Sequence, residues 1–97
     1  MPLDPKTAAH TAELFSALSD PNRVRIISAL LENEELNVSA LAKCLGMSIS
    51  AVSHQVSSLR QMRLVRARKE GRQVFYALDD AHVASLFRQG VDHAQHG

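Results

Sequence analysis

Gly46 separates two short helical patterns within residues 36–62, and this arrangement limits the fold more than any other feature of the chain. The first pattern runs from about Ser39 to Leu45, and the second starts after Ser48, a residue type preferred at helix N-caps. A glycine at such a junction supplies the positive φ angle with which many helices end. The segment therefore predicts a helix-turn-helix, in which two helices are joined by a tight turn.

The second of these helices is expected to have one buried and one exposed face. Val52, Val56 and Leu59 recur at helical spacing and predict the buried face. In a helix-turn-helix the second helix enters the major groove of DNA with its N-terminal residues nearest the bases, where Ile49 could contact a thymine methyl group. An ordinary solvated helix face is the alternative interpretation. The candidate DNA-contacting residues of this helix are Ser48, Ile49, Ser50, Ser53, His54, Ser57 and Arg60.

A β-hairpin is predicted directly after this helix. Residues 64–78, LVRARKEGRQVFYAL, alternate apolar and polar side chains on both sides of Gly71, which can adopt the backbone angles of a tight turn. The net charge of only +1 conceals a concentration of Lys and Arg over residues 60–72, where Glu70 is the single acidic residue. Such a hairpin is a wing, whose cations position a protein on phosphates and make its DNA affinity salt-dependent. The candidate phosphate contacts of the wing are Arg66, Arg68, Lys69 and Arg72.

Two amphipathic helices are predicted before the helix-turn-helix. The first covers AELFSAL and ends near Ser19, and the second is opened by Asp20 as N-cap and Pro21 as its first helical residue. With 97 residues and 45% hydrophobic composition, the chain fits one domain over residues 1–97, mainly α with a small β-hairpin (α+β). Because so small a domain buries a limited core, we expect a homodimer held through its first and last helices.

The composition excludes several other classes of protein. No stretch approaches the roughly 18 consecutive apolar residues of a membrane span, and MPLDPKTAAH has no apolar signal-peptide core. Cys44 is the single cysteine, so an intrachain disulfide is excluded, and we expect this residue to pack in a helix. We therefore expect a cytoplasmic protein that has neither a membrane nor a small organic substrate as a partner.

The last helix carries four groups that could bind a metal ion: Asp80, His82, His93 and His96. At a rise of about 1.5 Å per residue, His82 and His93 lie roughly 16 Å apart, too far to share one ion within a chain. The three histidines fall on one stripe of the helix together with Leu86 and Gln89, while Asp80 can join them only from an N-cap position. Two antiparallel copies of the helix, related by a two-fold axis, would form two identical sites.

Each shared site would combine Asp80 and His82 of one chain with His93 and His96 of the other. One carboxylate and three neutral imidazoles suit tetrahedral zinc, with two ions per dimer, and cobalt would also fit. An enzyme with a zinc-bound water is not expected, because protein ligands take all four positions and no general base is nearby. The alternative interpretation is a histidine-rich solvated surface or the remnant of a purification tag.

Two segments, LSDPNRVRIISAL and SISAVSHQVSSLRQMRLVRARKEGRQVFYAL, resemble the ArsR/SmtB family of winged-helix repressors, and the resemblance extends over nearly the whole chain. The last helix resembles the zinc-sensing branch, whose ligands match Asp80, His82, His93 and His96. The family implies a homodimer that binds double-stranded operator DNA without metal and represses a metal-efflux or sequestration operon. It also implies that metal binding releases the DNA.

The chain departs from other branches of that family at informative positions. Asn37 and Ser39 stand where sensors of arsenic, cadmium and lead carry cysteines, which makes a thiolate site there improbable. Relatives with six-coordinate nickel or cobalt sites recruit N-terminal histidines, and here only His10 is available for that role. A nickel or cobalt sensor, and a metal-independent DNA-binding structural module, remain the alternatives to a zinc-responsive repressor.

Overall fold

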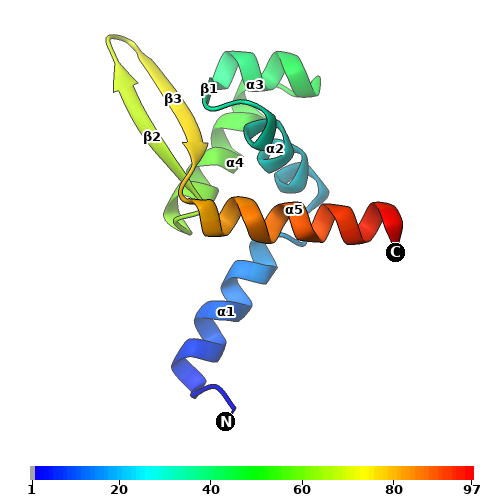
Figure 1. Ribbon diagram of the computed structural model, residues 1–97. Coiled ribbons are helices and arrows are strands. Elements are labelled where there is room, and N and C mark those ends of the chain that lie inside the picture. The colour runs from blue at the N-terminus through cyan, green and yellow to red at the C-terminus, as the bar shows by residue number, and fades with distance from the viewer. Residues whose placement is uncertain (1) are drawn as a thin grey trace.

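The computed structural model describes residues 2–97, which form five helices and a three-stranded antiparallel sheet. Helix α1 projects away from the rest of the chain, the β2–β3 hairpin extends on the other side, and α5 crosses near the base of the hairpin (Figure 1). No helix in this part of the chain has both the length and the apolar character needed to cross a membrane. In chain order the elements are α1 (Pro5–Ala17), α2 (Pro21–Glu32), β1 (Leu36–Asn37), α3 (Val38–Leu45), α4 (Ile49–Gln61), β2 (Val65–Glu70), β3 (Gln73–Leu78) and α5 (Ala81–His96).

Each helix starts where a short polar side chain caps it. The capping oxygen accepts a hydrogen bond from the backbone N–H three residues later, which satisfies one of the free donors of the first turn. The prediction that Ser48 and Asp80 are N-caps is confirmed, as is the prediction for Asp20. The N-cap residues are Asp4, Asp20, Asn37, Ser48 and Asp80.

Helix α1 begins earlier than its apolar pattern indicated. Asp4 accepts from the N–H of Thr7 at 2.7 Å, and Pro5 stands at the first helical position, where its missing N–H costs nothing. His10 therefore lies in the middle of α1 rather than at its start.

The predicted helix-turn-helix is formed by α3 and α4, and the hairpin by β2 and β3. Gly46 ends α3 at φ 65°, and Gly71 turns the hairpin at φ 61°, so both glycines adopt the left-handed conformation that they were expected to supply. The sheet differs from the prediction, because Leu36 and Asn37 add a third strand beside β3. A strand of two residues is too short to show an alternating pattern.

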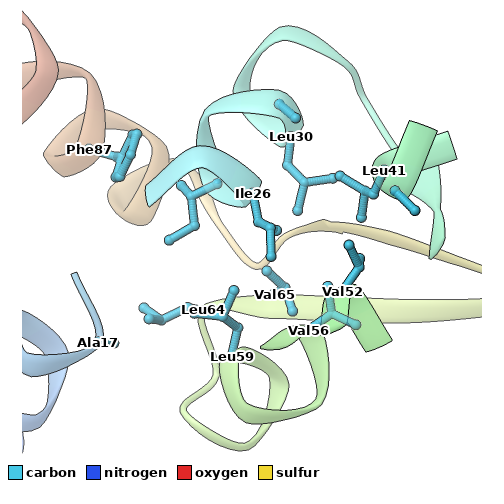
Figure 2. Packing of buried hydrophobic residues seen from close by; sticks show 13 residues of the cluster. Ala17, Ile26, Leu30, Leu41, Val52, Val56, Leu59, Leu64, Val65 and Phe87 are labelled. Atoms are coloured by element: carbon cyan, nitrogen blue, oxygen red, sulfur yellow. The ribbon is translucent and has the colours of Figure 1, made fainter. Parts of the chain in front are cut away.

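The core lies between α2, α3, α4 and the base of the hairpin. Val52, Val56 and Leu59 form the buried face of α4, as predicted, and Leu64 packs beside them (Figure 2). Phe87 brings α5 onto this cluster. Helix α1 contributes one fully buried residue, Ala17, so most of its surface is left uncovered within a single chain.

Cys44 corrects one expectation. The residue lies in helix α3 as expected, but its side chain is exposed and does not pack. The helix turns Leu41 and Ala42 into the core, and Cys44 falls on the other side.

Candidate DNA-binding surface and metal site

Helix α4 presents a continuous exposed face of small and polar residues opposite its buried stripe. Ile49 is an apolar exception at the start of the helix, where its side chain is 58% exposed. Ser48 caps the helix through its hydroxyl oxygen, which accepts from the N–H of Ala51 at 3.0 Å. The face is therefore shaped to approach another surface, and the sequence-predicted residues that are exposed on it are Ile49, Ser50, Ser53, His54, Ser57 and Arg60.

Two arginines of α2 hold the helix-turn-helix in place. The Nε atom of Arg23 donates to Oε1 of Gln55 in α4 at 3.1 Å. Arg25 donates to the carbonyl oxygen of Leu45 at 2.9 Å, which satisfies a free acceptor at the end of α3. Neither contact could be predicted from the sequence, because the partners are far away along the chain and carry no motif.

The cations of the wing are used in two different ways. Lys69 and Arg72 lie beside the hairpin turn, are exposed, and form no ion pair within residues 2–97. Arg66 is also exposed but donates to the carbonyl oxygen of Asp79 at 3.1 Å. Arg68 is held by carboxylates: it forms ion pairs with Glu35 and Glu70 and lies over the ring of Phe75.

The guanidinium of Arg68 lowers the pKa of the Glu35 carboxyl below its ordinary value of 4.5, chiefly through the hydrogen bonds that it donates. A depressed carboxyl pKa stabilises the fold above the ordinary pKa, and this contribution is lost as the pH falls through the folded-state value. We expect Glu35→Gln to reduce the loss of unfolding free energy between about pH 6 and about pH 3.5. Urea denaturation at both pH values measures this loss of unfolding free energy.

Glu34→Gln is the matched control for this prediction, because Glu34 is exposed and forms no ion pair in the described part of the chain. This variant should show the acid sensitivity of the wild type. If Glu35→Gln behaves in the same way, the ion pair contributes nothing to stability in solution.

Asp80 and His82 lie together at the start of α5. Oδ1 of Asp80 accepts from the N–H of Val83 at 2.9 Å and lies 4.0 Å from Nδ1 of His82. The His82 side chain is 99% exposed. The cap uses only Oδ1 of Asp80, and both side chains are exposed, so the carboxylate and the imidazole are accessible to an ion.

His93 and His96 lie at the opposite end of α5. Nε2 of His96 lies 3.5 Å from Oδ1 of Asp92, one helical turn earlier. Within residues 2–97 of one chain, no three or more His, Cys, Asp or Glu side chains gather closely enough to hold a metal ion. The structure thus brings Asp80 to His82 but does not bring this pair to the other two predicted ligands.

The stripe of α5 that carries the histidines borders an uncovered apolar groove of about 530 Å³. Leu86, Gln89 and His93, which belong to that stripe, line the groove together with residues of α1 and α2. Phe15 of α1 is 53% exposed there. Phe15 thus belongs to a contiguous exposed apolar surface, and such surfaces are typical of sites that contact a partner.

The fold and this surface define the class: a winged helix-turn-helix regulatory protein. Residues 20–67 match the family described as bacterial regulatory protein, arsR family. Over 88 residues the chain is 51% identical to a transcriptional repressor SmtB homolog from a Synechocystis species, a match that covers 91% of this chain and 66% of the relative. It is 42% identical to the HTH-type transcriptional regulator NmtR of Mycobacterium tuberculosis over 98% of this chain and 78% of that protein. The chain belongs to the arsR family.

Solved structures agree with this assignment. The solution structure of apo-NmtR superposes with a TM-score of 0.83 at 40% identity, over all of this chain and 81% of the other. A homodimeric winged helix-turn-helix DNA-binding domain of a possible ArsR-family regulator from Mycobacterium bovis superposes with a TM-score of 0.85 at 30% identity. This match covers 98% of the chain and 89% of the other domain. The winged helix-turn-helix prediction is confirmed.

Proposed function

We propose that this chain is a metal-responsive transcriptional repressor. A homodimer without metal binds operator DNA, and zinc bound between the two α5 helices releases it, which derepresses genes for metal efflux or resistance. The observation that carries the proposal is the coincidence of the histidine stripe of α5 with the uncovered groove beside α1. A second chain seated on this groove would approach the ligands that one chain cannot assemble. The repressor and regulator names of the relatives support the same function.

The DNA-binding half of the proposal rests on α4 and the wing. The exposed face of α4 can enter a major groove while its valines and Leu59 hold it on the core. Lys69 and Arg72 lie exposed at the hairpin tip without an ion pair among residues 2–97, so they can bind phosphates. The two α4 helices of a dimer would read two half-sites of an operator.

The residues of α5 fit zinc in donor type and in availability. Oδ1 of Asp80 and Nδ1 of His82 lie 4.0 Å apart. His93 and His96 are both exposed. A carboxylate and three imidazoles without thiolate suit zinc or cobalt. When bound, the ion would cross-link the two chains through α5. His10, which the family resemblance links to nickel or cobalt sites, lines a cleft with Glu13, Leu14 and the end of α4 and does not line the groove beside α5.

A short chain of hydrogen bonds connects the metal ligands to the DNA-binding helix. The N–H of Asp79, the residue before Asp80, donates to the carbonyl oxygen of Leu64 at 3.0 Å. The N–H of Leu64 donates to the carbonyl oxygen of Leu59 in α4, also at 3.0 Å. Arg66 adds its bond to the Asp79 carbonyl. A displacement at the start of α5 would thus reach α4 and the wing, and the coupling between metal and DNA is reciprocal.

Asp80 is expected to have two separable functions, helix cap and metal ligand. Asp80→Asn keeps a good N-cap, so we expect unfolding free energy close to that of the wild type and weaker zinc binding. Asp80→Ala also loses the cap, which costs about 1 kcal/mol more. Urea denaturation and competition with a chromophoric zinc chelator measure the two effects. If Asp80→Asn bound zinc with wild-type affinity, the Asp80 carboxylate would not be a metal ligand.

The proposal is tested by fluorescence anisotropy on DNA from upstream of the gene that encodes the chain. The protein is first titrated with a chelator present, and stoichiometric zinc is then added. Binding followed by release supports a metal-responsive repressor. If zinc leaves DNA binding unchanged, the result would support the metal-independent DNA-binding module. Repeating the titration with cobalt would show which of the two ions releases DNA more effectively.

A further inference from the structure

Arg68 has more internal partners than any other cation of the wing. Its Nε atom donates to Oε2 of Glu35 at 3.2 Å, and one terminal nitrogen donates to Oε1 of the same carboxylate. The other terminal nitrogen donates to Oε2 of Glu70 at 2.7 Å. The guanidinium carbon lies 5.0 Å from the centre of the Phe75 ring. All of these partners belong to the chain itself.

We infer that Arg68 is a positioning residue of the wing and does not bind phosphate. Its contact with Glu35 fixes the angle of the hairpin to the helix-turn-helix, while Lys69 and Arg72 contact the DNA backbone. The inference rests on the DNA binding proposed above and identifies which cations of the wing carry it.

The position of Glu35 in the chain connects the ion pair with Arg68 to the helix-turn-helix. Glu35 directly precedes β1, and β1 runs without interruption into α3, the first helix of the helix-turn-helix. Arg68 lies on β2, and its cross-strand partner on β3 is Phe75, which in turn pairs with Asn37 of β1. Asn37 also caps α3 and donates to the Gln73 side chain at 2.8 Å. Arg68 therefore contacts Glu35, the residue before β1, and Phe75, which pairs with the N-cap residue of α3.

The charges around Arg68 oppose a phosphate. Two carboxylates of the chain, Glu35 and Glu70, form ion pairs with the one guanidinium of Arg68. A DNA phosphate that bound Arg68 would compete with both carboxylates for the N–H groups of the guanidinium. Lys69, the next residue, has no acidic partner in the described chain and is exposed. The two adjacent cations are thus suited to different tasks.

Three variants separate positioning from phosphate contact: Arg68→Lys, Arg68→Gln and Lys69→Gln. Each phosphate contact contributes about 0.9 to the slope of log affinity against log salt concentration, so a dimer without Lys69 should lose about 1.8. We expect both Arg68 variants to weaken DNA binding about 2- to 30-fold with an unchanged slope. Lysine keeps the charge but not the planar fork that holds Glu35. Melting temperatures confirm that the variants are folded.

The result that would overturn the inference is a slope in Arg68→Gln that falls as far as in Lys69→Gln, with near wild-type binding in Arg68→Lys. Lys69→Gln tests the proposed DNA binding independently of Arg68. A slope that this variant leaves unchanged would contradict the proposed phosphate contact of Lys69, and not the positioning role of Arg68. Amide hydrogen exchange of the free protein adds a readout that needs no DNA. Arg68→Gln should speed exchange in β1 and in the outer part of the hairpin but not in α5. Unchanged exchange there would equally overturn the positioning role.

Discussion

Replacing His93 by alanine is expected to abolish the zinc response while leaving metal-free DNA binding intact. Loss of a direct ligand should weaken zinc binding by more than the roughly 10- to 100-fold that removal of an outer-shell partner costs. His93 lies on α5 beside the groove, and neither α4 nor the wing contributes to the lining of that groove. Chelator competition measures zinc affinity, and anisotropy measures DNA affinity with and without zinc.

His10→Ala is the matched control for the loss of an imidazole. His10 is exposed on α1 and lines a different cleft from His93. This variant should keep the wild-type zinc affinity and the release of DNA. A His93→Ala protein that still releases DNA at stoichiometric zinc would contradict the assignment of the α5 site.

Truncating Leu59 to alanine is expected to cause the largest loss of stability among single changes in α4. The side chain is fully buried and packs with Val56, Leu64 and Val65 (Figure 2). Such truncations cost about 2–5 kcal/mol, a large share of the roughly 5–15 kcal/mol that stabilises a small protein. DNA binding by the variant should weaken in proportion to the fraction of protein that this loss of stability leaves unfolded. Urea denaturation at a fixed protomer concentration measures the change, because dimerisation makes stability depend on concentration.

Ser57→Ala is the stability control for the Leu59 variant. Ser57 is exposed on the opposite face of the same helix, and its substitution should change the unfolding free energy by no more than about 0.5 kcal/mol. Equal losses in the two variants would mean that α4 is not packed on the core as the structure shows.

Much of the fold could be predicted because its signals are local. The caps at Asp20, Ser48 and Asp80 and the turns at Gly46 and Gly71 depend on residues within a few positions of one another. The apolar spacing of α4 defines its buried face in the same way. Strand β1 could not be predicted, since two residues form it only by pairing with β3 far along the chain.

The candidate site was predictable to a lesser extent for the same reason. The position of Asp80 followed from capping, and the separation of His82 from His93 followed from helix geometry. The role of Arg68 was hidden, because its partner Glu35 lies 33 positions earlier and only the folded sheet brings the two together. A basic run in a sequence gives no sign of which cations are already paired.

The proposed metal sites are each shared by two chains, and a mixed dimer can show whether this is so. One chain carries His82→Ala and the other His93→Ala, with different affinity tags so that the heterodimer can be isolated. If the sites are shared, one site of the heterodimer loses two ligands and the other keeps all four. We expect one tight zinc site per heterodimer and none in either mutant homodimer. A heterodimer without a tight site would contradict sharing across the two α5 helices.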